Sequence, residues 1–397
     1  MDKKPRVLII GGPDVEARIP LIKQIEHQFH FLVAGSQDQP EMPFLRAGIE
    51  FASYPMLRSA NPVADVRMLV SLIQLIRSAN VDIVHTFDTK PSVWGRIAAK
   101  IANVPVVIGT LPGLGSLYSR NDLSTHLIRS IYQPVQRMAC HRSDLTIFQN
   151  STDADHFVRA GIVPKQRAVV LPGSGVDTRR FDPAKFRNGK RTRLRAELGL
   201  HQEDLAITMV SRMIRSKGIL EFSQAAHLVS EHHPGTKFLL VGPNDPQSVD
   251  ALTEKEMEQV KRSVIWLGAR NDVPGLLSIS DLFAFPTYYR EGIPRVLLEA
   301  ASMGLPIVAT HSPGCTDVVE HNTNGFLVPQ QDIRAFSNAI TTLLVDPSLR
   351  SRFGHVSRQR AVHKFDLSVI AQNTTSIYQH LLITKSNGRK SAYSRSL

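Results

Sequence analysis

The sequence predicts an α/β protein with two Rossmann-like domains, each built on a parallel sheet that helices cover on both faces. Short apolar runs alternate with longer amphipathic stretches along almost all of the 397 residues. The apolar runs are continuous, which is typical of strands buried on both faces of a parallel sheet. The pattern restarts after a basic stretch with Pro and Gly at 172–195, which indicates a linker between two domains.

The expected strands are the short apolar runs bounded by polar, Gly or Pro residues. In the first domain these runs lie at 6–10, 29–35, 81–86, 104–110 and 145–150. In the second domain they lie at 206–212, 237–242, 264–268, 282–286 and 306–310. Helical periodicity is clear at 63–80 and 90–103. We therefore expect an N-terminal domain at 1–180, a C-terminal domain at 181–370, and a C-terminal helix with a basic tail at 371–397.

The chain is strongly basic, with a formal net charge of +12. The excess is concentrated at 85–143, at 179–195 and in the tail after Thr384. Such a balance favours anionic partners, namely phosphates, nucleic acid or an anionic lipid leaflet. A plain solvated surface with a frayed tail explains the same charge, and both interpretations stay open.

Several features predict a cytoplasmic protein. No run of eighteen apolar residues occurs, so no membrane span is expected. The first apolar run, at 7–10, is too short for a signal peptide. The two cysteines, Cys140 and Cys315, do not suggest a disulfide framework.

The stretch REGIPRVLLEA, at 290–300, carries two carboxylates around an expected helix start. Glu291 lies in the loop after a strand, Pro294 suits the first turn of the helix, and Glu299 lies inside it. A phosphate would suit the free backbone amides around this helix start, which belong to Gly292, Ile293, Arg295 and Val296. Two carboxylates beside that phosphate would suit a nucleotide diphosphate sugar. On spacing alone, a capping-region Glu291 and a solvated Glu299 are favoured.

The same stretch closely resembles the E-x7-E signature of retaining glycosyltransferases of family 4, which have the GT-B fold. The likeness continues through 171–183, 210–226 and 304–329. Residues 85–119 look like the members that build bacterial surface polysaccharides on lipid carriers. The resemblance implies that the N-terminal domain binds the acceptor and the C-terminal domain binds the nucleotide sugar.

The resemblance also implies roles in donor binding. Arg212 and Lys217 follow a strand and would contact the donor diphosphate; with Glu291, which would contact the donor sugar, they are the expected catalytic set. Glu299 would contact the ribose. Further donor contacts are expected from Gly12, Gly268, Arg270, Gly292, Ile293, Arg295 and Val296. The alternatives are surface cations on a loop for the two basic residues and a plain glycine turn after the first strand.

The acceptor side is expected at Arg18, His85 and Lys90. A helix-surface arginine and a structural histidine are the alternatives. Asp153 and Asp155 form a D-x-D triplet, which we interpret as the start of a helix capped by Ser151 or Thr152 rather than as a metal site.

The implied reaction is a retaining hexosyl transfer from a UDP-linked hexose or N-acetylhexosamine. The departing phosphate would take the acceptor proton, and no metal is expected. The loop after 104–110 has no histidine near Thr110, where many members carry one. The acceptor we expect is a polyprenyl-diphosphate-linked saccharide at the anionic cytoplasmic face of the inner membrane, with the alternating apolar and basic segment 123–138 as a contact.

Three other functions fit parts of the pattern. A nucleotide-sugar epimerase can share this fold, but no acid/base set for the sugar is evident. A non-catalytic nucleotide-sugar binding protein would normally be exported. Nucleic-acid binding is suggested by charge alone and lacks a recognition motif, so we expect no nucleic acid.

Overall fold

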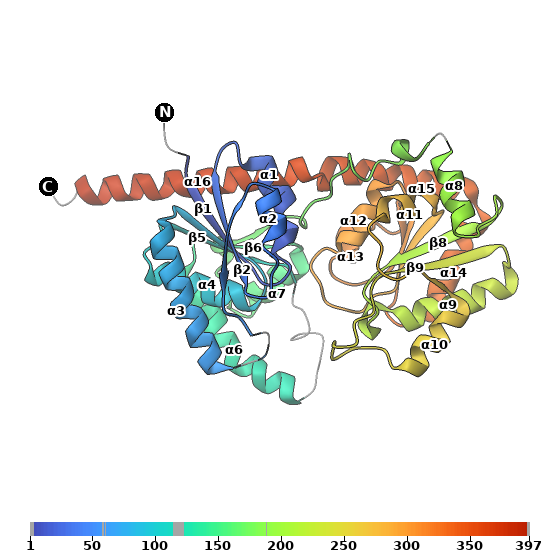
Figure 1. The fold of residues 1–397 in the computed structure, drawn as a ribbon, viewed down its shortest axis with the longest axis horizontal. Coiled ribbons are helices and arrows are strands. Elements are labelled where there is room, and N and C mark those ends of the chain that lie inside the picture. The colour runs from blue at the N-terminus through green and yellow to red at the C-terminus, as the bar shows by residue number, and fades with distance from the viewer. Residues whose placement is uncertain (1–3, 58, 60, 114–122, 188, 395–397) are drawn as a thin grey trace. The chain divides into compact units, whose positions relative to one another are not determined.

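The structure is a computed structural model that describes residues 4–57, 59, 61–113, 123–187 and 189–394. Part of the sequence that resembles the surface-polysaccharide members, 114–119, therefore lies outside the described residues, as do the last three residues of the basic tail. The chain forms two compact units (Figure 1). The N-terminal unit comprises 1–174 and 367–397, and the C-terminal unit comprises 175–366.

The N-terminal unit is built on a seven-stranded sheet in the order β3-β2-β1-β4-β5-β6-β7. Every strand pair is parallel. The strands are β1 (Arg6–Ile10), β2 (His30–Ser36), β3 (Glu50–Tyr54), β4 (Ile83–Thr86), β5 (Val106–Leu111), β6 (Leu145–Phe148) and β7 (Ala168–Val170).

Helices cover both faces of this sheet. One core joins α1 (Ile19–Ile25), α2 (Met42–Arg46) and α16 (Leu367–Ser394) to one face. A second core joins α3 (Pro62–Ala79) and α4 (Lys90–Ile101) to the other. Helix α6 (Leu123–Arg142) packs beside α4, and α7 (Ser151–Arg159) follows β6 (Figure 1). This two-sided covering explains the continuous apolar strands of the sequence.

The C-terminal unit is built on a six-stranded parallel sheet in the order β10-β9-β8-β11-β12-β13. The strands are β8 (Leu205–Val210), β9 (Thr236–Val241), β10 (Ile265–Trp266), β11 (Leu282–Phe285), β12 (Ile307–Thr310) and β13 (Gly325–Val328). The helices are α8 (Lys190–Glu197), α9 (Ile219–His232), α10 (Glu254–Ser263), α11 (Val273–Ile279), α12 (Arg295–Ser302), α13 (Cys315–Val318), α14 (Ile333–Val345) and α15 (Pro347–Arg360). The main apolar core of this unit has members from Val176 to Phe365, and a smaller one comprises Leu200, Ala206, Leu239 and Ile279.

The expectation of two parallel α/β domains is confirmed, and each predicted run overlaps a strand. The sequence did not indicate β3, β7 and β13, all of which are edge strands. Edge strands are covered on fewer sides, so their sequences need no continuous apolar run. Strand β7, for example, has only three residues, and two of them are exposed.

The units divide between Ser174 and Gly175, six residues before the expected boundary at 180/181. The chain returns to the N-terminal unit at Leu367, so α16 is part of that unit rather than a separate tail. The two ends of the C-terminal unit lie together, because the Val176 amide donates to the Phe365 carbonyl over 2.9 Å.

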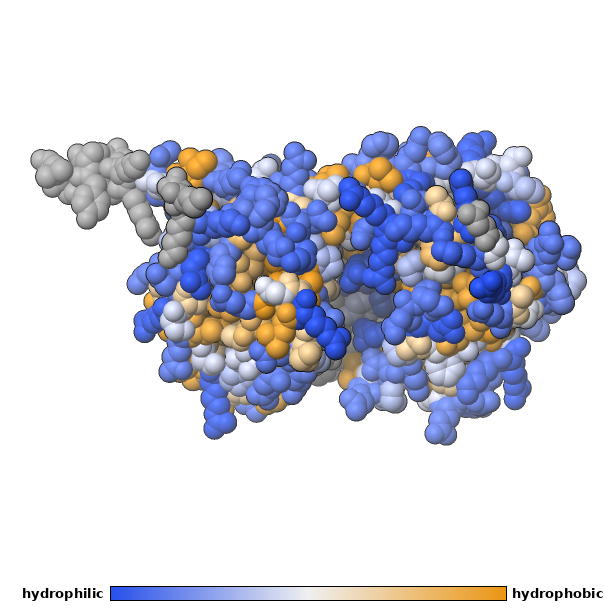
Figure 2. Space-filling model, turned by 45° about the horizontal axis from the view of Figure 1, so that its top comes forward, coloured by the Kyte–Doolittle hydropathy of each residue, from blue (hydrophilic) through white to orange (hydrophobic). Residues whose placement is uncertain are grey.

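Hydrophilic residues cover most of the drawn surface of both units, with hydrophobic residues in smaller patches between them (Figure 2). Among the helices that the structure describes, none has an apolar stretch long enough to cross a bilayer.

Candidate active site

The C-terminal sheet has its topological switch point between β8 and β11. The chain proceeds outward in one direction through β8, β9 and β10, and in the other through β11, β12 and β13. In open parallel sheets, ligands bind at the carboxyl ends of the strands where this reversal occurs. The loops that follow β8 and β11 carry Arg212, Lys217 and Glu291 to this place.

Lys217 and Glu291 meet as an ion pair, with 2.6 Å between the Lys217 Nζ and the Glu291 Oε1. The Lys217 side chain is 11% exposed and that of Glu291 is 23% exposed. The Lys217 ammonium also lies 5.0 Å from the centre of the Tyr289 ring. A cation held this way is oriented before a ligand arrives, yet it still reaches solvent.

Backbone hydrogen bonds fix the two loops together. The carbonyl of Ser216 accepts from the amides of Tyr288 and Tyr289, both over 2.9 Å. The same carbonyl accepts from the Thr287 hydroxyl over 3.2 Å. Because Ser216 directly precedes Lys217, these bonds bring the loop of Glu291 to the lysine.

Gly218 makes this close approach possible. Its φ is +82°, and a Cβ there would lie 2.2 Å from the Pro286 carbonyl oxygen. Only glycine combines this left-handed backbone with so near a neighbour. Helix α9 begins directly afterwards, at Ile219.

The start of α12 lies next to Glu291. Pro294 is the residue before the helix, with φ −62° and ψ 118°, and is not in the first turn as expected. The amides of Arg295 and Val296 are in that first turn, where a helix supplies no internal acceptor. Gly292 and Ile293 are buried in the preceding loop.

Glu299 is a largely buried carboxylate on the inner side of α12, not a solvated helix residue. Its Oε1 lies 3.8 Å from the Arg295 Nη2. Burial raises the pKa of Glu299, and the charges of Arg295 and Arg180 oppose that rise. The charges of two arginines therefore act on this carboxylate, which lies in the middle of α12.

The other predicted donor residues of this unit are near the surface. Arg212 is half exposed, at 51% of its side chain, and its Nη1 lies 2.7 Å from the Asp245 Oδ2. Arg270 forms a two-point bond with Asp272, over 2.8 and 2.6 Å. That pairing raises the pKa of Arg270 and lowers the pKa of Asp272.

Gly268 lies at the end of β10 with φ +66° and open space where a Cβ would be. Its carbonyl accepts from the Gly242 amide over 2.8 Å. Trp266, which the sequence places in the strand, packs against the apolar core, and its indole N–H donates to the Gly242 carbonyl over 3.0 Å.

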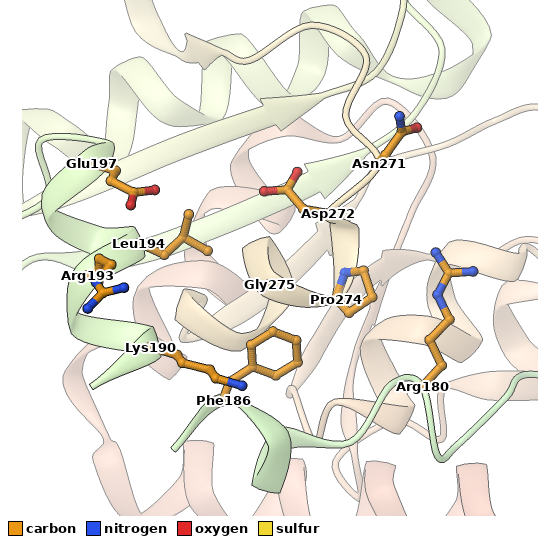
Figure 3. Close-up of a pocket in the computed structure, with 10 residues that line it drawn as sticks. All are labelled: Arg180, Phe186, Lys190, Arg193, Leu194, Glu197, Asn271, Asp272, Pro274 and Gly275. Atoms are coloured by element: carbon orange, nitrogen blue, oxygen red, sulfur yellow. The ribbon is translucent and has the colours of Figure 1, made fainter. Parts of the chain in front are cut away.

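A pocket of about 390 Å³ lies between α8 and α11 (Figure 3). Its walls are formed by Arg180, Phe186, Lys190, Arg193, Leu194, Glu197, Asn271, Asp272, Pro274 and Gly275. In Figure 3, Arg180 and Asn271 lie at one end, and Lys190, Arg193 and Glu197 lie at the other. Arg180 links this pocket to the first site, because its charge also acts on Glu299.

The N-terminal sheet has its own switch point, between β1 and β4. Here the Gly12 amide donates to the Asp88 Oδ2 over 2.7 Å. A Cβ on residue 12 would lie 3.1 Å from that oxygen, so the glycine makes room for the carboxylate. The Gly12 amide thus has a partner inside its own unit.

Arg18 lies at the same switch point. Its guanidinium is 4.8 Å from the centre of the Phe87 ring, and its Nη1 donates to the Ser174 hydroxyl over 3.1 Å. Its charge lowers the pKa of Asp88, but burial raises that pKa more. Arg18 is therefore part of a packed cluster rather than an ordinary arginine on a helix surface.

His85 and Lys90 are occupied by bonds within the N-terminal unit. The His85 ring is buried between the hydroxyls of Tyr378 and Thr110, at 2.6 and 2.7 Å. Burial, with the charges of Arg18 and Arg96, lowers the pKa of His85 to about 3. His85 is therefore a structural histidine, neutral and inside the fold, rather than an exposed residue that could contact an acceptor.

The Lys90 ammonium has three acceptors, which equals its number of N–H groups. They are the Asp65 Oδ1 at 2.6 Å and the carbonyls of Leu57 and Ser59 at 2.7 and 2.8 Å. Lys90 therefore fastens the loop before α3 in this structure.

Asp153 belongs to a helix cap. The side chain of Asn150 accepts from the Asp153 amide over 2.8 Å, so Asn150 caps α7. The expectation of a cap by Ser151 or Thr152 was wrong. The strand β6 ends at Phe148, two residues earlier than expected, which frees Asn150 for the cap. In the part of the chain that the structure describes, no cluster of three His, Cys, Asp or Glu is placed to bind a metal.

Sequence reasoning overlooked three residues of these sites. The left-handed φ of Asp88, +65°, is invisible in a sequence. Asp245 and Arg180 lie far along the chain from their partners. The basic stretch 179–195 includes Arg180, but nothing in the sequence distinguishes Arg180 from the other basic residues of that stretch.

Two parallel α/β units with cations and carboxylates at a switch point are consistent with one class of protein, which the comparisons with known proteins identify. The family "Glycosyl transferases group 1" matches residues 190–360, and "Glycosyl transferase 4-like domain" matches residues 23–173. This chain belongs to the group 1 glycosyltransferases, family 4, of the GT-B fold.

Two relatives match nearly the whole chain. One is the UDP-Gal:alpha-D-GlcNAc-diphosphoundecaprenol alpha-1,3-galactosyltransferase of Escherichia coli, 27% identical over 90% of this chain and 91% of its own. The other is the N,N'-diacetylbacillosaminyl-diphospho-undecaprenol alpha-1,3-N-acetylgalactosaminyltransferase of Campylobacter jejuni, 25% identical over 94% and 97%. The expectation of a glycosyltransferase is thereby confirmed.

Solved structures agree on the fold. Anabaena HepE in complex with UDP superimposes with a TM-score of 0.76, at 21% identity, over 94% of this chain and all of that one. The sucrose-phosphate synthase of Thermosynechococcus elongatus superimposes with a TM-score of 0.77, at 18% identity, over 96% of this chain and all of that one.

Proposed function

We propose that this glycosyltransferase moves a hexose or N-acetylhexosamine from a UDP-sugar to a polyprenyl-diphosphate-linked saccharide in surface-polysaccharide synthesis. The observation that carries the proposal is the Lys217–Glu291 pair, held at the switch point beside the start of α12. Support for a lipid-linked acceptor comes from the names of the two relatives. The reaction would take place at the cytoplasmic face of the inner membrane.

The donor diphosphate is proposed to bind between Lys217, Arg212 and the first turn of α12. These groups supply positive charge where negative charge develops on the leaving diphosphate. They would do so without a metal ion. When the donor binds, Glu291 would accept hydrogen bonds from hydroxyls of the donor sugar, and its ion pair with Lys217 would weaken.

Glu299 is proposed to accept hydrogen bonds from the ribose. Its burial and the two nearby arginines suit a carboxylate that is ordered before the ligand arrives. The nucleobase would lie near Gly268 and Arg270, towards the end of the pocket that Arg180 and Asn271 form.

Transfer is proposed to retain the anomeric configuration. The bond from the anomeric carbon to the diphosphate oxygen breaks, and the acceptor oxygen attacks from the same face. The departing diphosphate oxygen takes the proton of the acceptor hydroxyl. Because His85 is buried and neutral, we do not assign its imidazole as the base that takes the proton of the acceptor hydroxyl.

The test is release of nucleoside diphosphate from UDP-, GDP- and ADP-sugars with bacterial lipid extract, with and without EDTA. We expect UDP release that depends on lipid, survives EDTA and is lost in Lys217→Ala. Lys261→Ala is the matched control, because Lys261 also pairs with a glutamate but lies exposed on α10. An epimerised sugar without added lipid, or equal loss in both variants, would overturn the proposal.

A further inference from the structure

Helix α3 carries an apolar stripe on its outer face. Val63, Val66 and Val70 are 65%, 58% and 48% exposed. Their spacing places them on one side of the helix. The side that packs on the sheet is formed by other residues, Met68, Leu72 and Ile76, which are buried. The valines are therefore apolar without contributing to the core of the unit.

The same outer face is positively charged. Arg67 and Arg77 are exposed, and at 100° per residue both lie within a quarter turn of Val63. In the ranges that the structure describes, no ion pair engages either arginine. Asp65, the one acidic residue of α3, points to the other side of the helix, where it pairs with Lys90.

The helix start is firmly held, so the stripe is preformed. The Asn61 side chain caps α3 by accepting from the Ala64 amide over 3.0 Å. Lys90 ties Asp65 to the loop that carries Leu57, another exposed apolar residue. Binding through such a surface costs little ordering of backbone.

We propose that the outer face of α3 docks on an anionic lipid bilayer, with Val63, Val66 and Val70 at the boundary of headgroups and acyl chains. Arg67, beside the stripe, and Arg77, beyond its C-terminal end, pair with lipid phosphates. The proposal rests on the proposed function in one respect, because a lipid-linked acceptor brings the enzyme to such a surface. A helix face that presents apolar residues together with arginines suits binding in the plane of a membrane interface.

The charge of the chain favours a bilayer over a second copy of the protein. A twofold contact through α3 would bring Arg67 and Arg77 of each copy against the same positive face. The chain as a whole has a formal net charge of +12, which adds to that repulsion. An anionic surface instead complements both the arginines and the net charge.

The test is co-sedimentation of the full chain with vesicles of phosphatidylcholine, alone or mixed with phosphatidylglycerol. We expect binding to the mixed vesicles only, weakened by salt. The double variants Val66→Asp with Val70→Asp, and Arg67→Gln with Arg77→Gln, should each bind about tenfold more weakly. Far-UV circular dichroism checks that both remain folded.

Met42→Asp is the matched control. Met42 is 54% exposed on α2, whose Phe44 belongs to the core on the opposite face of the sheet. It should bind vesicles as the wild type does. Equal weakening by Met42→Asp, or no weakening by either double variant, would overturn the assignment to α3. If the wild type sediments as a dimer and the valine variant as a monomer, the stripe is instead an interface between copies of the chain.

Failure of this inference is distinguishable from failure of the proposed function. The valine variant should transfer sugar to a detergent-dispersed, short-chain prenyl-diphosphate saccharide at the wild-type rate, because α3 holds none of the proposed donor residues. A wild type that binds vesicles but transfers nothing would remove the proposed function and keep the docking face. A valine variant that loses transfer to the dispersed acceptor would overturn the docking role.

Discussion

At the residue scale, the candidate active site holds its charges in pairs within the protein. Lys217 lies on Glu291 and Arg212 lies on Asp245. A diphosphate carries more negative charge than one carboxylate, so it competes for both cations. Donor binding is thus expected to exchange these protein partners for phosphate oxygens.

Asp245→Asn should tighten the binding of UDP. The substitution removes the carboxylate that neutralises Arg212, and an exposed pair of this kind is worth about 0.5–1 kcal/mol, or roughly a two- to fivefold change in the dissociation constant. Isothermal titration calorimetry at low salt measures the effect. Asp332→Asn, which keeps the cap of α14, is the control, and unchanged or weaker UDP binding by Asp245→Asn would contradict the expectation.

Asp88→Asn should stabilise the chain at neutral pH. Burial raises the pKa of Asp88 in the folded state, so the folded protein holds this proton more tightly than the unfolded chain does. The cost of the buried charge is therefore present at high pH and vanishes as the pH falls below the ordinary pKa of aspartate. Asparagine tolerates the left-handed backbone and still accepts from the Gly12 amide.

Thermal unfolding at several pH values checks the Asp88→Asn prediction. The variant should have the higher melting temperature at pH 7–8, and the difference should disappear near pH 4, close to the ordinary aspartate pKa. Asp38→Asn, at an exposed position, should show no such dependence. A variant that is less stable than the wild type at pH 8 would show that the charged form of Asp88 is favoured.

At the element scale, the strands were predictable where both of their faces are buried. Central strands such as β4 and β12 are wholly buried, and their apolar runs identify them. The edge strand β3 has exposed residues within it and gave no comparable signal. The helix start after Glu291 was also predictable, but the place of Pro294 relative to the first turn was not.

Gly218→Ala should cost far more stability than Gly189→Ala. Both glycines have φ near +80°, which costs an alanine about 1–2 kcal/mol. Residue 189 has open space for a Cβ, whereas at residue 218 the Cβ would meet the Pro286 carbonyl at 2.2 Å. The Gly218 variant must therefore displace the loop between β11 and α12.

Urea unfolding and UDP titration measure the two glycine variants. We expect Gly189→Ala to lose about 1–2 kcal/mol with unchanged UDP affinity. Gly218→Ala should lose at least about 3 kcal/mol and bind UDP weakly, because the clash adds to the backbone cost. Equal losses in the two variants would mean that the loop moves aside without cost.

At the scale of the whole molecule, the chain leaves the N-terminal unit once and returns to it. The C-terminal unit is one continuous segment whose ends are joined by the bond from Val176 to Phe365. The N-terminal unit is completed only by α16, which contributes Leu367, Ile370 and Tyr378 to its core.

The fragment 175–366 should therefore fold alone, and the fragment 1–174 should not. The first contains its entire apolar core, whereas the second would expose the face that α16 covers. Circular dichroism and urea unfolding of the two fragments check this. A cooperative transition in 1–174, or its absence in 175–366, would show that the apolar cores do not decide which unit folds independently.

The sequence by itself determined the fold class, the order of the buried strands and the family, because strand burial and the E-x7-E stretch are local patterns. It also determined which loops follow which strands, and so named Lys217 and Glu291. Only the tertiary structure decided that these two side chains meet, that Asp88 takes the Gly12 amide, and that His85 lies buried between Thr110 and Tyr378. Such contacts join residues far apart in the chain, and the packing that brings them together leaves no periodic trace in the sequence.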